Sequence, residues 1–144
     1  MGCETCRETG ECAIEGDDME LLLSELEDCD ALIIGSPAYY RNVTAQLKAL
    51  FDRSFVFNNR KLLAGELGGA IAVGRGEGGG QSLVLTIIHN YYLSSGAICV
   101  PCEINGLSAR ADKPGDILKQ ENRLSQARIL GENIIKYSEM IFKS

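Results

Sequence analysis

Three cysteines near the amino terminus carry the clearest chemical signal in the sequence. Cys3, Cys6 and Cys12 lie within the first dozen residues of a 144-residue chain that has six cysteines. Thiolates are the preferred ligands of iron–sulfur clusters and bind zinc well, and the two-residue spacing of Cys3 and Cys6 lets both sulfurs reach one site. Such sites usually need four ligands, whereas this segment supplies three, and Cys29 is expected to lie too far away. Free thiols remain the alternative interpretation.

Two loops have the composition of a ligand site. Residues 36–42, Ser-Pro-Ala-Tyr-Tyr-Arg-Asn, combine small residues with tyrosines that could border a flat aromatic ring. Residues 74–81, Gly-Arg-Gly-Glu-Gly-Gly-Gly-Gln, permit close backbone approach and precede a predicted helix, whose amino terminus favours anionic or electron-rich groups. The second loop is neither a P-loop nor a convincing dinucleotide fingerprint. Surface tyrosines and a mobile glycine-rich loop are the alternatives.

Three other features are expected to be structural. Cys99 and Cys102 span the end of a predicted strand, whereas a redox-active Cys-x-x-Cys normally begins a helix. His89 is the only histidine and lies within a predicted helix, with no visible Ser or Cys partner. Asp17 is expected to cap a helix, with Glu20 completing a capping box, so no metal site is expected there.

Alternating strands and helices must position these residues. Continuous apolar runs at 31–36, 69–74 and 97–101 predict buried strands, the first of them covered on both faces, as in parallel sheets. Helices are predicted from Asp17, around Leu47 to Phe51, and over 81–94. A last amphipathic helix follows a predicted loop at 105–120, and its apolar stripe is Leu124, Ala127, Leu130, Ile134, Tyr137 and Ile141.

The order of these elements predicts an α/β fold with a parallel sheet and right-handed crossovers. Ligands of such sheets bind beyond the carboxyl ends of the strands, which here means residues 36–42, 74–81 and 101–106. Length and the lack of a linker predict one domain, 1–144, with 1–16 as a cysteine-rich loop.

Composition excludes several classes of protein. Hydrophobic residues make up 45% and charged residues 24%, as in ordinary globular domains. The net charge of −6, without a basic stripe, argues against nucleic-acid binding. No apolar run is long enough to span a bilayer, and the amino terminus does not look like a signal peptide. A cytoplasmic protein without membrane partners is therefore expected.

Taken together, the motifs resemble one family. The pattern Cys-x-x-Cys-x-x-Thr-Gly-x-Cys from Cys3, the pattern Ser-Pro-x-Tyr-x-x-Asn followed by Gln-Leu-Lys-x-x-x-Asp-Arg from Ser36 to Arg53, and Gly-Gly-Gln at 79–81 are similar to segments of iron–sulfur flavoproteins and related NAD(P)H-dependent FMN reductases. The resemblance runs to at least Val100. It implies a flavodoxin-like three-layer fold, bound FMN and redox chemistry at the flavin.

The resemblance also implies a set of site residues. The cofactor-binding residues would be Ser36, Pro37, Ala38, Tyr39, Tyr40, Asn42, Gly79, Gly80 and Gln81. Cys3, Cys6 and Cys12 would be ligands of a [4Fe–4S] cluster, and no side chain is expected to be a catalytic acid or base. A homo-oligomer is implied, with a ferredoxin-like protein or NAD(P)H as redox partner.

Two departures from the family pattern bear on these expectations. The family's first strand, phosphate-binding loop, first helix and second strand have no counterpart, so the chain is expected to be a truncated form or to complete its sheet with another subunit. The family's first cluster cysteine would precede Met1. The alternatives are therefore a cofactor-poor or zinc-binding structural or interaction fragment, or a flavin or quinone reductase without a cluster.

Overall fold

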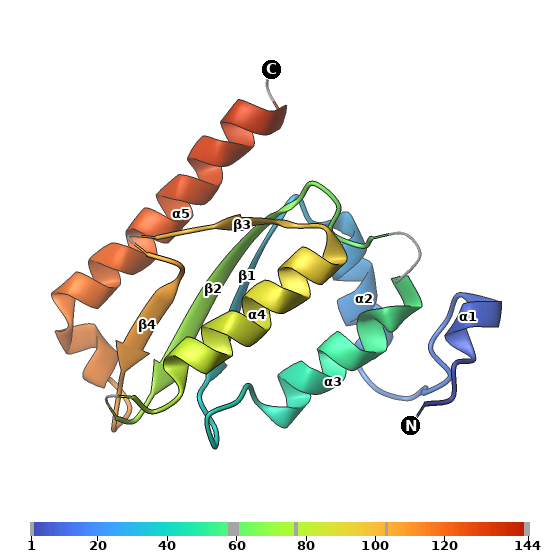
Figure 1. The fold of residues 1–144 in the computed structure, drawn as a ribbon, viewed down its shortest axis with the longest axis horizontal. Coiled ribbons are helices and arrows are strands. Elements are labelled where there is room, and N and C mark those ends of the chain that lie inside the picture. Colours follow the sequence, from blue (N-terminus) through green and yellow to red (C-terminus); the bar gives the residue numbers. More distant parts are fainter. Residues whose placement is uncertain (1, 58–60, 77, 103, 143–144) are drawn as a thin grey trace.

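The fold is built around one open parallel sheet. The computed structural model describes residues 2–57, 61–76, 78–102 and 104–142. The central strand, β2 (Leu67–Gly74), pairs along one edge with β1 (Ala31–Pro37), in the register Ala31↔Leu67. Its other edge carries two short strands end to end, β3 (Ile98–Val100) and then β4 (Leu107–Arg110). All four strands are parallel (Figure 1).

Helices cover the two faces of this sheet (Figure 1). On one face, α4 (Gln81–Ser95) packs Val84, Leu85 and Ile88 against Ala70 and Ala72 of β2. On the other, α5 (Glu121–Phe142) packs Leu130 against β2, β3 and β4. The remaining helices are α1 (Cys6–Thr9), α2 (Met19–Asp28) and α3 (Ala45–Arg53), with short 3₁₀ turns at Ser54–Phe57 and Asp116–Lys119.

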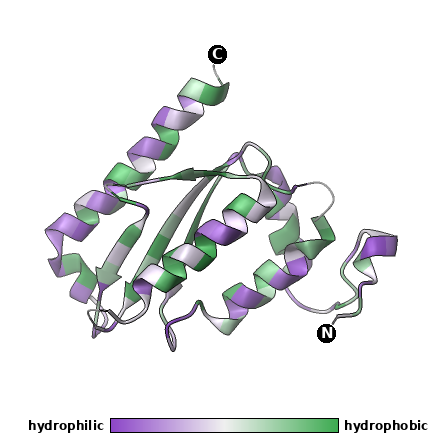
Figure 2. Ribbon diagram, viewed as in Figure 1, coloured by the Kyte–Doolittle hydropathy of each residue, from purple (hydrophilic) through white to green (hydrophobic). Residues whose placement is uncertain are grey.

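The predicted order of strands and helices is confirmed, because it follows from local patterns. Hydrophobic residues run along the strands, while the helices alternate hydrophobic and hydrophilic residues (Figure 2). Thr44 begins α3 by accepting the Leu47 N–H with its hydroxyl. Gly96 ends α4 with a φ of 88°, where its N–H donates to the carbonyl of Leu93.

Tyr92 joins α4 to the backbone of the two long strands. Its ring is fully buried, and its hydroxyl accepts the Ile34 N–H over 3.0 Å and lies 2.8 Å from the carbonyl oxygen of Gly69. A Cβ on Gly68 would lie 2.8 Å from the ring, so glycine is required for this approach. Burial raises the pKa of Tyr92, which keeps its proton available as a donor.

Three expectations from the sequence are wrong in detail. First, β1 is not buried on both faces, because α5 covers the other strands; Ile33 is 47% exposed while Ile34 is buried. Second, the predicted loop at 105–120 contains β4, whose four residues are too few for an alternating pattern to stand out. Third, residues 1–16 are not entirely loop, because one helical turn, α1, begins at Cys6.

Asp17 also differs slightly from its predicted role. The structure starts α2 at Met19 with Asp18 as the capping residue, and the Asp18 side chain makes no capping bond. The Asp17 carboxylate nevertheless accepts the Met19 N–H over 3.1 Å. Across the described ranges, no helix is both long enough and apolar enough to cross a membrane.

Candidate functional site

The loop after β1 closes in a tight two-residue turn. Tyr39 and Asn42 exchange backbone hydrogen bonds of 3.0 Å in both directions, and the two residues between them, Tyr40 and Arg41, have φ of 51° and 64°. This is the left-handed geometry of a type I′ turn, where glycine and asparagine are usual. Non-glycine residues keep such a conformation where their surroundings impose it, often at ligand sites.

Ser36 shapes this loop. Its buried hydroxyl donates to the carbonyl oxygen of Pro37 over 2.9 Å and accepts the Thr44 N–H over 3.2 Å. The neighbouring N–H of Ala38 donates to the carbonyl of Val73 over 2.7 Å. The Ser36 hydroxyl and the Ala38 N–H therefore form hydrogen bonds within the protein. In cofactor binding these two residues would position the turn.

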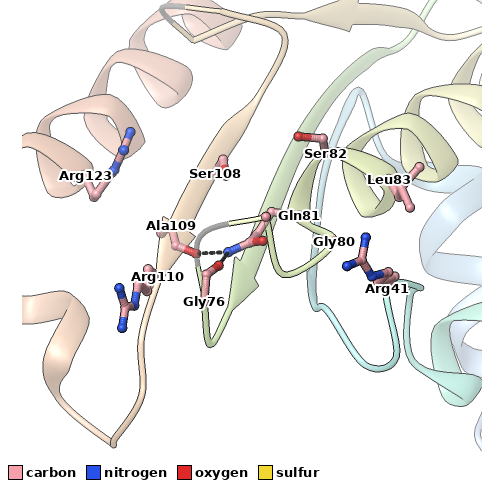
Figure 3. A pocket seen from close by; sticks show the side chains of 11 residues that line it. Arg41, Gly76, Gly80, Gln81, Ser82, Leu83, Ser108, Ala109, Arg110 and Arg123 are labelled. Atoms are coloured by element: carbon pink, nitrogen blue, oxygen red, sulfur yellow. Dashed lines mark hydrogen bonds between the residues drawn. The ribbon is translucent and has the colours of Figure 1, made fainter.

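Gln81 orders the glycine-rich loop after β2. Its side chain is only 7% exposed, and its Nε2 donates to the carbonyl oxygens of Gly76 at 3.0 Å and Ala109 at 3.4 Å (Figure 3). A Cβ on Gly74 would lie 2.6 Å from this side chain. Gln81 thus fastens the loop to β4, and the glycine at 74 leaves room for it.

The two loops meet at Gly80. This residue has a φ of 101°, and a Cβ on it would lie 2.5 Å from the Cα of Arg41. Both its conformation and its contact with the Tyr39–Asn42 turn therefore require glycine. The first turn of α4 begins at the next residue, so the free backbone N–H groups of a helix amino terminus lie at the junction of the loops.

A cavity of about 430 Å³ opens at this junction, beyond the carboxyl ends of β2 and β4 (Figure 3). That is the size of a pocket for a small cofactor, and glycines give it a backbone-lined wall suited to a flat ring. The residues present therefore fit a flavin. The described lining residues are Arg41, Gly76, Gly78, Gly80, Gln81, Ser82, Leu83, Ser108, Ala109, Arg110 and Arg123.

Three arginines line the cavity, although the chain as a whole is acidic. Arg41, Arg110 and Arg123 approach it from three different elements, and its described lining residues include no carboxylate. Arg110 is steadied by Asp112, whose Oδ2 lies 3.1 Å from its Nη2, and Arg123 by Gln126 at 2.9 Å. Such a local potential attracts anionic ligands and phosphate esters.

Only two of the predicted cofactor-binding residues, Gly80 and Gln81, line this cavity. The side chain of Tyr40 is fully exposed at the tip of the turn. Arg41 lies within the Ser-Pro-Ala-Tyr-Tyr-Arg-Asn motif, although the motif does not indicate its contact with the cavity. Nothing in the sequence indicates Ser108, Arg110 or Arg123, because β4 and α5 reach the cavity only through the folded sheet. Pro37, Tyr39, Asn42 and Gly79 belong to the same two loops but are not among the lining residues, and their part in cofactor binding stays a prediction.

The predicted cysteine ligands lie apart from this cavity, since α1 is at the opposite end of the molecule from the glycine-rich loop (Figure 1). Cys3 is exposed, and hydrogen bonds from Thr5 hold its pKa below the ordinary value. Cys12 accepts a hydrogen bond from Nε of Arg53 over 3.3 Å. No three metal-binding side chains converge anywhere in the described ranges. As arranged here, the three cysteines do not fit a cluster site.

The residues expected to be structural take that role. Cys102 is buried, and Cys99 and Cys29 pack at the edge of the core around α4. Burial raises the pKa of the Cys99 thiol and lowers the pKa of His89, so it favours the uncharged form of both groups. Neither group lines the cavity between the two loops.

Comparison with known proteins gives a family. Residues 3–109 match the family described as NADPH-dependent FMN reductase. An iron–sulfur flavoprotein of Methanocaldococcus jannaschii is 36% identical over 99% of this chain and 76% of its own length. A second iron–sulfur flavoprotein of that organism is 42% identical, over 65% of this chain and 48% of its own. The chain thus spans three quarters of one relative and about half of the other.

Solved structures confirm the fold. A WrbA-like flavodoxin from Agrobacterium tumefaciens superposes with a TM-score of 0.62, at 21% identity, over 76% of this chain and 69% of its own. General stress protein 14 of Treponema denticola, crystallised in complex with FMN, gives a TM-score of 0.58 at 16% identity, over 89% of this chain and 75% of its own. The flavodoxin-like α/β fold expected from the motifs is confirmed.

Proposed function

Because this chain belongs to the NADPH-dependent FMN reductase family, a class of FMN-dependent oxidoreductases, we propose that it works as an electron-transfer flavoprotein of the iron–sulfur flavoprotein kind. The observation that carries the proposal is the cavity where the Tyr39–Asn42 turn, the glycine-rich loop and β4 meet. FMN, when bound, supplies a ring that accepts and donates electrons. The protein supplies binding, orientation and charge.

The chain's own groups have distinct tasks in this proposal. Gly76, Gly78 and Gly80 leave a surface of backbone on which a flat ring can lie. The first turn of α4, with Ser82, offers unpaired N–H groups to electron-rich atoms. The arginines stabilise negative charge, whether on a phosphate or on a reduced ring.

FMN binding is the first test, with two matched variants on α4. Leu83 is 50% exposed and lines the cavity, whereas Leu93 is 64% exposed on the same helix and does not line it. A carboxylate at position 83 would repel an anionic cofactor. We expect Leu83→Glu to weaken FMN binding by at least about fivefold in a fluorescence titration, roughly 1 kcal/mol. Leu93→Glu should bind like wild type, and equal weakening by both variants would remove the cavity as the site.

An iron–sulfur cluster bound by Cys3, Cys6 and Cys12 is a separate part of the proposal. It is supported by their spacing and by the printed names of the relatives, while the structure leaves the three sulfurs apart. Iron and acid-labile sulfide should be measured in anaerobically purified protein. Cys6→Ser should lose the iron and Cys29→Ser should keep it. If the wild-type protein still contains no iron after reconstitution, the chain works as a reductase without a cluster.

A homo-oligomer is proposed as the working form. In one chain α1 and the glycine-rich loop lie at opposite ends (Figure 1), so a neighbouring subunit would have to bring the cysteines of one chain near the cavity of another.

The electron donor is proposed to be NAD(P)H or a ferredoxin-like protein. A relative named NAD(P)H dehydrogenase (quinone), from Chromohalobacter salexigens, is 32% identical over 77% of this chain and 63% of its own length. Its name supports NAD(P)H as the electron donor. Stopped-flow reduction with each donor would separate them. A cytoplasmic location stays a prediction.

A further inference from the structure

Arg53, the last residue of α3, contacts the cysteine segment, residues 3–17, at three points. Its Nε donates to Sγ of Cys12 over 3.3 Å, its Nη2 donates to the carbonyl oxygen of Ile14 over 2.8 Å, and its Nη1 pairs with the carboxylate of Asp17. The side chain is only 15% exposed. One guanidinium therefore joins α3 to a segment about forty residues earlier in the chain.

These contacts matter because the segment has little regular structure of its own. No helix or strand lies between the end of α1 at Thr9 and the start of α2 at Met19. Backbone without a helical or strand partner depends on side-chain contacts for its order. The planar fork of arginine suits this task, since its five N–H donors can bind a sulfur, a carbonyl and a carboxylate at once.

Arg53 also sets the charge beside Cys12. Both residues line a second cavity, of about 440 Å³, between the cysteine segment, α2 and the end of α3. Arg53 is the one cation among the described lining residues of this cavity. The lining carboxylates belong to Glu11, Glu15, Asp17, Glu20 and Glu27. Without the guanidinium, the sulfur of Cys12 would face a surface of negative charge.

We propose that Arg53 is the positioning residue of the cysteine segment. It holds residues 12–17 against the end of α3 and keeps a positive charge at the sulfur of Cys12, before and independently of any metal. Cys12 is thereby held in place with a positive charge beside its sulfur, while Cys3 stays exposed near the amino terminus. The proposal does not depend on the cluster or on FMN.

The charge at Cys12 can be measured with two alkylating reagents. Iodoacetate is anionic and iodoacetamide is neutral, and both attack through the thiolate, so the ratio of their rates cancels the thiolate fraction and reports local charge. Rates at Cys12, with Cys3 as internal reference, are followed by mass spectrometry of metal-free, reduced protein. We expect Arg53→Met to lower the iodoacetate to iodoacetamide ratio at Cys12 by about threefold. Arg53→Lys should restore most of it.

A matched control lies on the same helix. Lys48 pairs with Asp52 on the exposed side of α3, so Lys48→Met removes an equal charge away from the segment and should leave the ratio unchanged. Asp17→Asn removes the ion pair but keeps the guanidinium, and should not lower the ratio. An unchanged ratio in folded Arg53→Met would overturn the proposal, as would an equal fall in Lys48→Met. If Arg53→Met fails to fold by circular dichroism, Arg53→Gln, which is neutral and hydrogen-bonding, replaces it.

The holding role has its own readout. A glutamate-specific protease cleaves after Glu11 and Glu15, which flank the Ile14 contact, and cleavage requires the segment to leave the surface. We expect several-fold faster cleavage there in Arg53→Met and in Asp17→Asn, and no change in Lys48→Met. If Arg53→Met and Asp17→Asn are both cleaved at the wild-type rate, Arg53 does not hold the segment.

Discussion

Single glycines decide whether the two loops of the site can meet. At Gly80, the φ of 101° and the contact with Arg41 both exclude a side chain, so the residue carries a conformational and a steric requirement together. Gly131 is the opposite case, because it lies within α5 and a Cβ there would have open space around it. The same substitution at the two positions therefore separates a loop requirement from helix propensity.

We predict opposite effects of alanine at these positions. Gly80→Ala should destabilise the protein by about 1–3 kcal/mol, because alanine must strain the backbone or displace Arg41. It should also weaken FMN binding. Gly131→Ala should stabilise by about 0.5–1 kcal/mol through helix propensity. Urea denaturation measures both values, and a stabilising Gly80→Ala would show that the loops do not pack as described.

Glu66 is expected to make the stability of the fold depend on pH. Its Oε2 is buried without a hydrogen-bond partner in the described part of the chain, and burial, followed by the nearby Asp30, raises the pKa of the carboxyl. The folded state therefore binds this proton more tightly than the unfolded state. Its contribution to stability is favourable at low pH and is lost as the pH rises from the unfolded pKa through the folded one.

Glu66→Gln avoids the loss of stability that occurs when this carboxyl ionises. We predict that the variant melts above wild type by about 2–4 °C at pH 7, with the difference shrinking or reversing near pH 4. Thermal melts across this range measure it. Glu25→Gln, which removes an exposed carboxylate from α2, is the control for the loss of one negative charge. A constant difference at every pH would assign the effect to something other than ionisation.

At the scale of elements, one hydroxyl joins a helix to two strands. Tyr92 reaches from α4 through the space left by Gly68 to the backbone of β1 and β2. A buried hydroxyl between backbone groups leaves unpaired polar atoms when it is removed. We predict that Tyr92→Phe costs about 1–3 kcal/mol in chemical denaturation. Tyr40→Phe, at the fully exposed tip of the turn, should be neutral. Equal stability of the two variants would contradict the contact.

At the scale of the whole molecule, β1 is the weak edge of the sheet. In the part of the chain that the structure describes, β1 pairs on one side only, and its seven residues, Ala-Leu-Ile-Ile-Gly-Ser-Pro, include no charge. Natural sheets usually protect such edges with charged residues or a covering element. The adjoining face is also open, as the exposure of Ile33 shows.

We predict that the chain self-associates through this region. Light scattering coupled to size exclusion should give a mass above that of one chain, and Ile33→Lys should shift the distribution toward the monomer. Leu93→Lys, which changes an exposed leucine on α4, should not. A monomeric wild-type chain at micromolar concentration would refute the prediction and, with it, this route to a homo-oligomer.

The sequence by itself determined the features that depend on neighbouring residues. Apolar runs marked β1, β2 and β3, and apolar residues at helical spacing marked α2, α3 and α5. Ordered motifs identified the family. Each of these signals lies within a short stretch of chain. The structural roles of Cys99 and His89 followed in the same way, from their places in a strand and a helix.

Only the tertiary structure decided which distant residues meet. Pairing of β4 with the far end of β2 brings Arg110 to the glycine-rich loop, and α5 adds Arg123. The fold likewise places Arg53 against Cys12 and leaves Ile33 open. None of these has a local signature, since a contact between residues far apart in sequence depends on sheet register and helix packing, which no single segment encodes.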